Sequence, residues 1–205
     1  MTTEIPYVSD EELSTRAERF LHEHNPAATV PVPIEEIVEF RLGLDIVPVP
    51  GLRGVRGIDG YLSSDRSSIL VDDAMFRSFQ NRYRFTLAHE VGHLVLHGDL
   101  YRGFRSEAEW IEFHRDLASH VLHRAEYQAN YFAGCVLVPG RSLPGVAQDA
   151  VRNLSRPVQA RDPDFDLSSE AFWTYVAEEV ARKFFVSTET ARIELQRNGL
   201  WRRAP

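Results

Sequence analysis

The residues with the densest potential for chemistry lie between positions 84 and 97 of the chain. His89 and His93 stand four residues apart, so on a helix their side chains lie on one face, about one turn from each other. Two imidazoles in this arrangement can bind one metal ion. Glu90 follows His89 directly, which puts its carboxylate beside such an ion, where it can take a proton from metal-bound water. The spacing therefore predicts a hydrolytic metal site.

The flanks of this pattern predict a buried helix. Apolar side chains surround the histidines on almost every side, as expected in a core: Phe85, Leu87, Ala88, Val91, Leu94, Val95 and Leu96. A charge inside such a helix is costly unless a metal ion or hydrogen-bond partners offset it. Two interpretations remain: a site of the His-Glu-x-x-His type found in zinc-dependent peptidases, or a core helix whose histidines are hydrogen-bonded.

A third ligand is needed from a second element, because a catalytic zinc ion usually has three protein ligands and a fourth position for water. Glu126 is the best candidate, an acid on a downstream helix among small and apolar residues. Asn130 lies four residues later on the same face, where its amide could hold the free ring nitrogen of a ligating histidine. His97 is the alternative third ligand, although three ligands on one straight helix suit a tetrahedral ion poorly.

A long helix is predicted between the two blocks of candidate ligands. Residues 106–109 form a capping box, and apolar residues keep helical spacing over residues 108–125 and on to Gly134. We expect three histidines of this helix to lie at the surface or to be hydrogen-bonded, although one of them could stabilise a tetrahedral intermediate: His114, His120 and His123.

The elements that must position the site are predicted from periodicity and turn signals. Helices are expected over residues 10–24 and 34–40, and strands over residues 44–49, 58–62 and 68–71. The glycine-rich residues 51–60 predict a mobile loop. The strand at residues 68–71 could hold an extended substrate by strand addition. Asp72 and Asp73 cap a short segment that leads into the motif helix.

Composition narrows the class of protein. The chain has 205 residues, 43% of them hydrophobic, and a net charge of −7, which argues against a general nucleic-acid-binding surface. Cys135 is the single cysteine and cannot form an internal disulfide, so a reducing compartment is expected. The first residues do not resemble a signal peptide, and no apolar run reaches the ~18 residues of a membrane span. We expect a soluble, cytoplasmic protein.

Together, the blocks at residues 84–97 and 126–139 resemble the ImmA/IrrE family of zinc metallopeptidases, gluzincin-like enzymes that cleave helix-turn-helix repressors and so derepress genes. The resemblance covers residues 31–140. It implies an α+β fold with a small zincin-like domain, a short mixed sheet and an active-site helix.

Position by position, the resemblance implies His89, His93 and Glu126 as ligands of one Zn²⁺ or Mn²⁺ ion, Glu90 as the base and Asn130 as the companion that holds a ligand. This chain departs from the family in two ways. Members often have a second acid where this chain has Gln128, and the linker between the blocks is longer than usual.

The C-terminal part is predicted as a second region. We expect a metallopeptidase domain over residues 1–145 and a helical region over residues 146–205, and residues 141–166, which cross this boundary, are rich in turn formers. Residues 180–196 resemble the helix-turn-helix segment that follows the peptidase unit in relatives. Acidic residues alternate there with basic ones, which weakens phosphate attraction, so a packing or repressor-docking role is favoured over DNA binding. The alternative function is a non-catalytic module that holds DNA or a repressor through these helices, with a structural metal.

Overall fold

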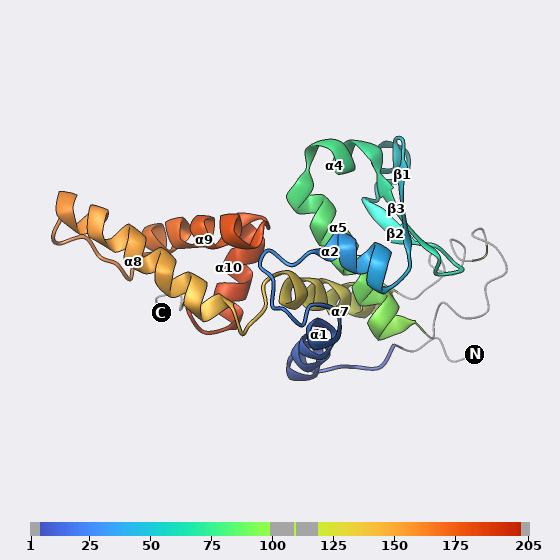
Figure 1. The fold of residues 1–205 in the computed structure, drawn as a ribbon, viewed down its shortest axis with the longest axis horizontal. Helices are drawn as coiled ribbons and strands as arrows, with labels where there is room; N and C mark the ends of the chain where they lie inside the picture. Colours follow the sequence, from blue (N-terminus) through green and yellow to red (C-terminus); the bar gives the residue numbers. More distant parts are fainter. Residues whose placement is uncertain (1–4, 99–108, 110–118, 202–205) are drawn as a thin grey trace.

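The computed structural model describes residues 5–98, 109 and 119–201. A mixed sheet and the helix that carries His89 lie toward one end of the molecule, the C-terminal helices form the other end, and α7 lies between them (Figure 1). The elements in chain order are α1 (Asp10–His24), α2 (Ile34–Glu36), the π-helical turn η1 (Ile37–Arg41), β1 (Asp45–Val49), α3 (Leu52–Arg56), β2 (Gly60–Leu62), β3 (Ser68–Asp72), α4 (Asp73–Ser78), α5 (Gln80–His97), α7 (Ser119–Leu137), α8 (Leu143–Arg161), α9 (Glu170–Phe184) and α10 (Thr188–Arg197). The predicted α+β class with a short mixed sheet is confirmed.

The sheet has the strand order β1-β3-β2. β1 runs parallel to β3, with Asp45 opposite Ser68, and β2 runs antiparallel to β3, with Leu62 opposite Ile69. β3 therefore has a partner on both sides, and its backbone groups are taken up by the ladder. The prediction that residues 68–71 hold a substrate by strand addition is wrong, because only an edge strand can accept another strand.

The glycine-rich stretch after β1 contains the short helix α3, where the sequence predicted a loop. Gly51 and Gly57 flank α3 with φ values of 70° and 71°, a conformation that other residues adopt at a cost. The Asp72 carboxylate fixes the stretch, because it accepts a hydrogen bond from the Arg53 amide at 2.9 Å. The same carboxylate caps α4 by accepting from the amides of Ala74 and Met75, as predicted.

Helix α5 packs against α7 at unusually short range. A Cβ atom on Gly92 would lie 3.1 Å from both the Cα and the carbonyl oxygen of Ala129, and 3.3 Å from the Phe132 ring. Phe132 and Val91 are fully buried in the same contact. The missing side chain at position 92 thus lets the backbone of α7 approach the face of α5 that carries the histidines.

The sheet is held against α5 by a second close approach. A Cβ atom on Gly60 would lie 2.7 Å from the Thr86 methyl group. β2 therefore lies directly beside α5, and its amide groups reach the motif helix.

Helices α9 and α10 begin with serine caps. The Ser169 hydroxyl accepts from the Phe172 amide at 3.3 Å, and the Ser187 hydroxyl accepts from the Thr190 amide at 3.1 Å. Between α9 and α10, Phe185 adopts a left-handed conformation with a φ of 56°. This residue gives the chain the sharp turn between the two helices.

Helix α8 runs through the stretch that is rich in turn formers. Pro144 lies in its first turn, where a missing amide N–H leaves no helical hydrogen bond unmade. Pro157 lies one turn before the end of α8, so it removes one bond from a nearly finished helix. Leu143, Ala147 and Ala150 recur at helical spacing and are buried, and this burial outweighs the turn propensity.

The C-terminal helices are anchored to the first turns of α5. The Arg84 guanidinium donates to the carbonyl oxygens of Phe185 at 3.1 Å and Val32 at 2.7 Å. The Asn81 amide donates to the Val186 carbonyl oxygen at 3.0 Å. The turn between α9 and α10 is therefore fixed against the N-terminal end of the motif helix.

Helix α10 also meets α7 through a buried carboxylate. Glu194 is 1% exposed, pairs with Arg197 and lies against Gly134, where any side chain would collide with it. Arg197 in turn stacks 3.6 Å from the centroid of the Tyr131 ring. Burial raises the pKa of Glu194 to about 7, against the lowering effect of Arg197.

Two further sequence predictions concern the helix over residues 106–125 and the absence of a membrane span. Most of the helix predicted over residues 106–125, including three of the four residues of its capping box, lies outside the described residues. Among the described residues, no helix is both long enough and apolar enough to cross a lipid bilayer.

We predict that Gly92→Ala destabilises the protein, because overpacking a rigid contact costs about 1–3 kcal/mol and the gain in helix propensity is at most ~1 kcal/mol. Urea unfolding measures the change. Gly145→Ala is the matched control, since a Cβ there meets nothing within 4 Å, and it should be neutral or stabilising. Equal effects of the two variants would contradict the close approach of α5 and α7.

We also predict that Glu194→Gln changes how stability depends on pH. A carboxyl group whose pKa is raised from 4.5 to about 7 in the folded state contributes stability below its unfolded pKa and loses it as pH rises toward the folded value. The free energy of unfolding of the wild type should therefore fall, relative to the variant, between about pH 5 and about pH 8. Glu178→Gln, on the exposed face of α9, controls for the loss of one negative charge.

Candidate metal centre

The structure brings His89, His93 and Glu126 together across the α5–α7 contact. His89 Nε2 lies 3.2 Å from Glu126 Oε2, and His93 Nε2 lies 3.4 Å from Glu126 Oε1. The three potential ligand atoms lie within 4.8 Å of one another, and among the described residues this is the group of histidine and carboxylate side chains that could hold a metal ion. Two imidazole nitrogens and one carboxylate oxygen form a donor set that suits Zn²⁺ with one position left open.

The protonation states of this group suit ligation. Burial lowers the pKa of His93 to about 4, so its imidazole is neutral near neutral pH. Burial alone would raise the pKa of Glu126, but the close imidazoles of His89 and His93 outweigh it and lower the pKa of the carboxyl. Metal ligands must be deprotonated, so both groups are ready to bind without releasing a proton.

The surroundings of His89 stabilise its positively charged form, whereas those of His93 do not. Burial disfavours its charged form, yet the hydrogen bond with Glu126 and the charges of Glu90 and Glu126 together raise its pKa. The field of two carboxylates at this point stabilises a proton, and it would stabilise a divalent cation more. The electrostatics of the site thus fit a bound cation.

Glu90 is buried beside the metal-binding group and is oriented by the sheet. The Leu62 amide of β2 donates to Glu90 Oε2 at 3.0 Å. Burial raises the pKa of Glu90 to about 7. A carboxylate whose pKa lies near neutrality can both accept and return a proton, which is the property of a general base.

Asn130 holds His89 from the side away from the metal-binding group. Asn130 Oδ1 lies 3.0 Å from His89 Nδ1. An amide oxygen accepts only, so the contact keeps the ring proton on Nδ1 and leaves Nε2 with a lone pair. The role of Asn130 as the residue that orients a metal ligand stays a prediction, with this contact in its support.

His93 is held by a chain of hydrogen bonds that sequence reasoning missed. The Gln128 amide nitrogen donates to the Pro6 carbonyl oxygen at 2.9 Å, so Oε1 of the same side chain faces His97 Nε2 at 2.8 Å and accepts its proton. His97 Nδ1 is then an acceptor, and it lies 3.1 Å from His93 Nδ1. The proton of His93 therefore stays on Nδ1, and Nε2 has a lone pair for a metal ion.

Of the other candidate histidines, the structure describes the side chains of His97 and His123, and neither joins the metal-binding group. His97, the alternative third ligand, lies behind His93, with both ring nitrogens engaged. His123 is exposed on α7. His114 and the side chain of His120 lie outside the described part of the chain. The signal for the role of His97 was its spacing of four residues from His93, which puts it on the same face of α5.

Comparison with known proteins assigns the family. Residues 77–196 match the family model of the IrrE N-terminal-like domain, peptidase M78, over more than half of the chain. The chain belongs to the M78 family. This confirms the resemblance inferred from the two motif blocks, and membership supports a peptidase, with a metal ion at the His89, His93 and Glu126 group. The M78 match continues through most of α10, beyond the boundary predicted at residue 145, and that boundary stays a prediction.

A solved structure shares the fold. A Mycobacterium tuberculosis transcriptional regulator aligns with a TM-score of 0.54 and 18% sequence identity, over 93% of this chain and 47% of that structure. The M78 chain thus corresponds to less than half of that regulator. The search of curated proteins found no match to the sequence of this chain.

We predict that Gln128→Leu weakens Zn²⁺ binding by about 10- to 100-fold, the usual effect of losing a residue that orients a ligand. Leucine cannot accept the proton of His97 Nε2, so the tautomer of His93 is no longer fixed. Chelator competition measures the affinity, and ¹⁵N NMR of the metal-free protein reports the tautomer. Gln148→Leu, on the exposed face of α8, is the control. Unchanged Zn²⁺ affinity in Gln128→Leu would show that the hydrogen-bond chain does not contribute to metal binding.

Proposed function

We propose that this M78 chain is a zinc-dependent endopeptidase that hydrolyses a peptide bond in a helix-turn-helix transcriptional repressor, in the cytoplasm, and thereby derepresses genes. The observation that carries the proposal is the convergence of His89, His93 and Glu126 beside the buried carboxylate of Glu90. A Zn²⁺ ion held by this group would supply Lewis acidity toward a water molecule and a peptide carbonyl.

The chain's own residues account for the proton transfers. The Leu62 amide holds Glu90 Oε2, so Oε1 is the atom that takes the proton from the attacking water. Glu90 then passes this proton to the nitrogen of the departing amine. Burial raises the pKa of Glu90 to about 7, so its carboxyl can take up and release a proton near neutral pH. Asn130 and the His97–Gln128 pair keep the imidazoles of His89 and His93 oriented throughout.

A transcriptional repressor as substrate is supported by the family. The ImmA/IrrE resemblance implies repressor cleavage, and the structure with the similar fold belongs to a transcriptional regulator. At 18% identity the similarity to that regulator shows a common fold and nothing about the substrate, so the inferred substrate depends on the family.

The competing function, a non-catalytic module that reads DNA, is less well supported by α10. Arg192 donates to Glu189 at 2.9 and 2.7 Å, and Arg197 pairs with Glu194. Each arginine is thus accompanied by a carboxylate on the same helix, which weakens attraction to phosphate. The inner face of α10 is buried through Ala191, Glu194 and Leu195.

We predict that Glu90→Gln lowers cleavage of the helix-turn-helix repressor encoded by the neighbouring gene by about 10²- to 10⁴-fold, the usual contribution of a general base. Glutamine keeps an oxygen for the Leu62 amide, so the fold and the Zn²⁺ content should persist. Gel analysis and mass spectrometry measure cleavage, and metal analysis checks the Zn²⁺ content. Chelation should stop the wild type, and added Zn²⁺ should restore it. If the wild type cuts the repressor no faster than the variant, the enzymatic function fails.

A further inference from the structure

The N-terminal segment of residues 5–7, which precedes α1, is docked against α7 behind the metal-binding group. Ile5 is 1% exposed. Its neighbours in a small core are Val121 and Ala125 of α7. The Arg124 guanidinium donates to the Ile5 carbonyl oxygen at 2.8 Å, and the next carbonyl, that of Pro6, accepts from Gln128 Nε2 at 2.9 Å. The segment is therefore held by a buried side chain and by two consecutive carbonyl groups.

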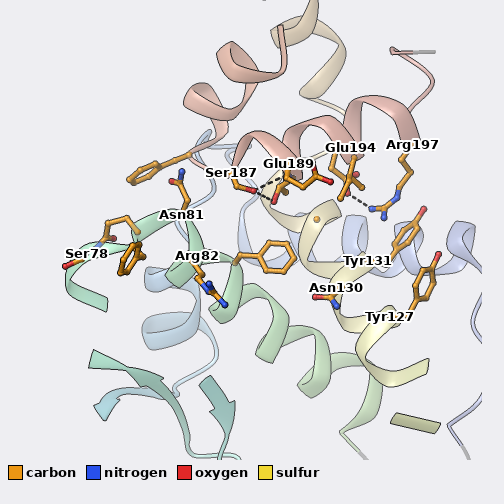
Figure 2. A pocket seen from close by; sticks show the side chains of 17 residues that line it. Ser78, Asn81, Arg82, Tyr127, Asn130, Tyr131, Ser187, Glu189, Glu194 and Arg197 are labelled. Carbon is orange, nitrogen blue, oxygen red and sulfur yellow. Dashed lines mark hydrogen bonds and ion pairs between the residues drawn. The ribbon is translucent and has the colours of Figure 1, made fainter. Parts of the chain in front are cut away.

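The two amides that hold the imidazoles of the site lie in different surroundings. Asn130 is exposed beside a groove between α5, α7 and α10, where Figure 2 shows it with Tyr127 and Tyr131. Water can therefore complete the hydrogen bonds of its N–H groups. Gln128 is 2% exposed, so its amide needs an acceptor within the protein, and the Pro6 carbonyl is such an acceptor.

The orientation of the Gln128 amide decides the direction in which the hydrogen-bond chain runs. With Nε2 on Pro6, the amide oxygen accepts from His97, and His97 Nδ1 accepts from His93 Nδ1. If the amide is turned over, Nε2 donates to His97, and both imidazoles must carry their protons on the opposite nitrogens. The proton of His93 then lies on Nε2, the atom that faces Glu126. The second arrangement therefore blocks the nitrogen that would bind the metal ion.

The Pro6 carbonyl disfavours this second arrangement. In it, the Gln128 oxygen would face the carbonyl oxygen at 2.9 Å with no proton between the two atoms. The histidines do not set the direction themselves, because a neutral imidazole can donate from either nitrogen and accept at the other. Among the groups of this chain, the backbone carbonyl is the one whose role is fixed, since it only accepts.

We propose that the N-terminal segment is part of the metal centre: docked on α7 through Ile5 and Arg124, it places the Pro6 carbonyl where it sets the tautomer of His93 and thereby the affinity for the metal ion. Ile5 and Arg124 are positioning residues, because they act on His93 through Gln128 and His97. The proposal rests on the metal site of the proposed function, but it does not depend on the cleavage of a substrate.

The test measures Zn²⁺ affinity by chelator competition and the His93 tautomer by ¹⁵N NMR of the metal-free, full-length protein. Ile5→Ser and Arg124→Ala should each weaken Zn²⁺ binding by about tenfold, the lower end of the effect of losing a residue that orients a ligand. Both variants should increase the fraction of His93 that carries its proton on Nε2. Ile5→Val, which keeps a branched apolar side chain, should retain the wild-type affinity.

Matched controls separate the docking of the segment from a general loss of structure. Tyr7→Ser changes the same segment at a side chain that is 78% exposed. Arg141→Ala removes a guanidinium that donates to a different backbone carbonyl, that of Asn25, at 3.2 Å. Both control variants should bind Zn²⁺ as tightly as the wild type. Thermal unfolding checks that each variant is folded.

A second background, Gln128→Glu, tests whether the segment acts through the hydrogen-bond chain. An ionised carboxylate accepts at either oxygen, so the direction of the chain no longer depends on Pro6. Ile5→Ser should therefore weaken Zn²⁺ binding in the wild-type background and leave the affinity of Gln128→Glu unchanged. An equal loss of affinity in both backgrounds would mean that the segment acts only through general stability, and the proposal would be overturned.

The remaining outcomes distinguish this proposal from the proposed function. Zn²⁺ binding that Ile5→Ser and Arg124→Ala both leave unchanged overturns the role of the segment and keeps the metal centre. No Zn²⁺ binding by the wild type, together with a His93 tautomer that changes in both variants, supports the role of the segment in orienting His93 and overturns the zinc peptidase. Neither Zn²⁺ binding nor a change of tautomer overturns both.

Discussion

The contact between Gly92 of α5 and Ala129 of α7 is the constraint on which the metal centre depends. A Cβ at position 92 would lie 3.1 Å from the Ala129 backbone, so the two helices approach as closely as their main chains allow. Glu126 lies almost one turn before Ala129 on α7, and His89 and His93 lie on either side of Gly92 on α5. The interhelical distance therefore sets the distances between the carboxylate and the two imidazoles. Two rigid helices at fixed separation hold the ligands more precisely than a loop would.

The orientation of the ligands depends on the layer of side chains behind them. Asn130 fixes His89, and Gln128 fixes His93 through His97. Both supporting residues are amides, and both lie on α7 close to Glu126. One helix thus supplies a ligand and the groups that orient the other two. The amide of Gln128 donates to the Pro6 carbonyl while it accepts from His97, which an ionised carboxylate at this position could not do.

Sequence periodicity predicted the elements that have strong local signals. The helix over residues 10–24 and the cap at Asp72 were predicted correctly, because apolar periodicity and a short polar side chain before a helix are local features of the sequence. Helix α8 was not foreseen, since Pro144 and Pro157 are turn formers by propensity and the burial that overrides them is a tertiary effect. The sequence likewise did not predict the strand order, because nothing in residues 68–71 shows that this strand has a partner on both sides.

For the metal centre, the sequence predicted which residues meet, because i, i+4 spacing on two helices is a local property. It did not predict the chain from Pro6 to His93, which joins the N-terminal segment to α7 and α5 across more than a hundred residues. Long-range hydrogen bonds of this kind have no periodic signature.

Arg84 joins three parts of the chain at one point. Its guanidinium binds the Val32 carbonyl near the N-terminal end and the Phe185 carbonyl between α9 and α10, and it lies over the Phe185 ring at 5.3 Å. This one side chain holds the turn before α10 to the helix that carries His89. Because one buried guanidinium makes these contacts, the turn before α10 cannot separate from α5 without leaving N–H groups of Arg84 without an acceptor.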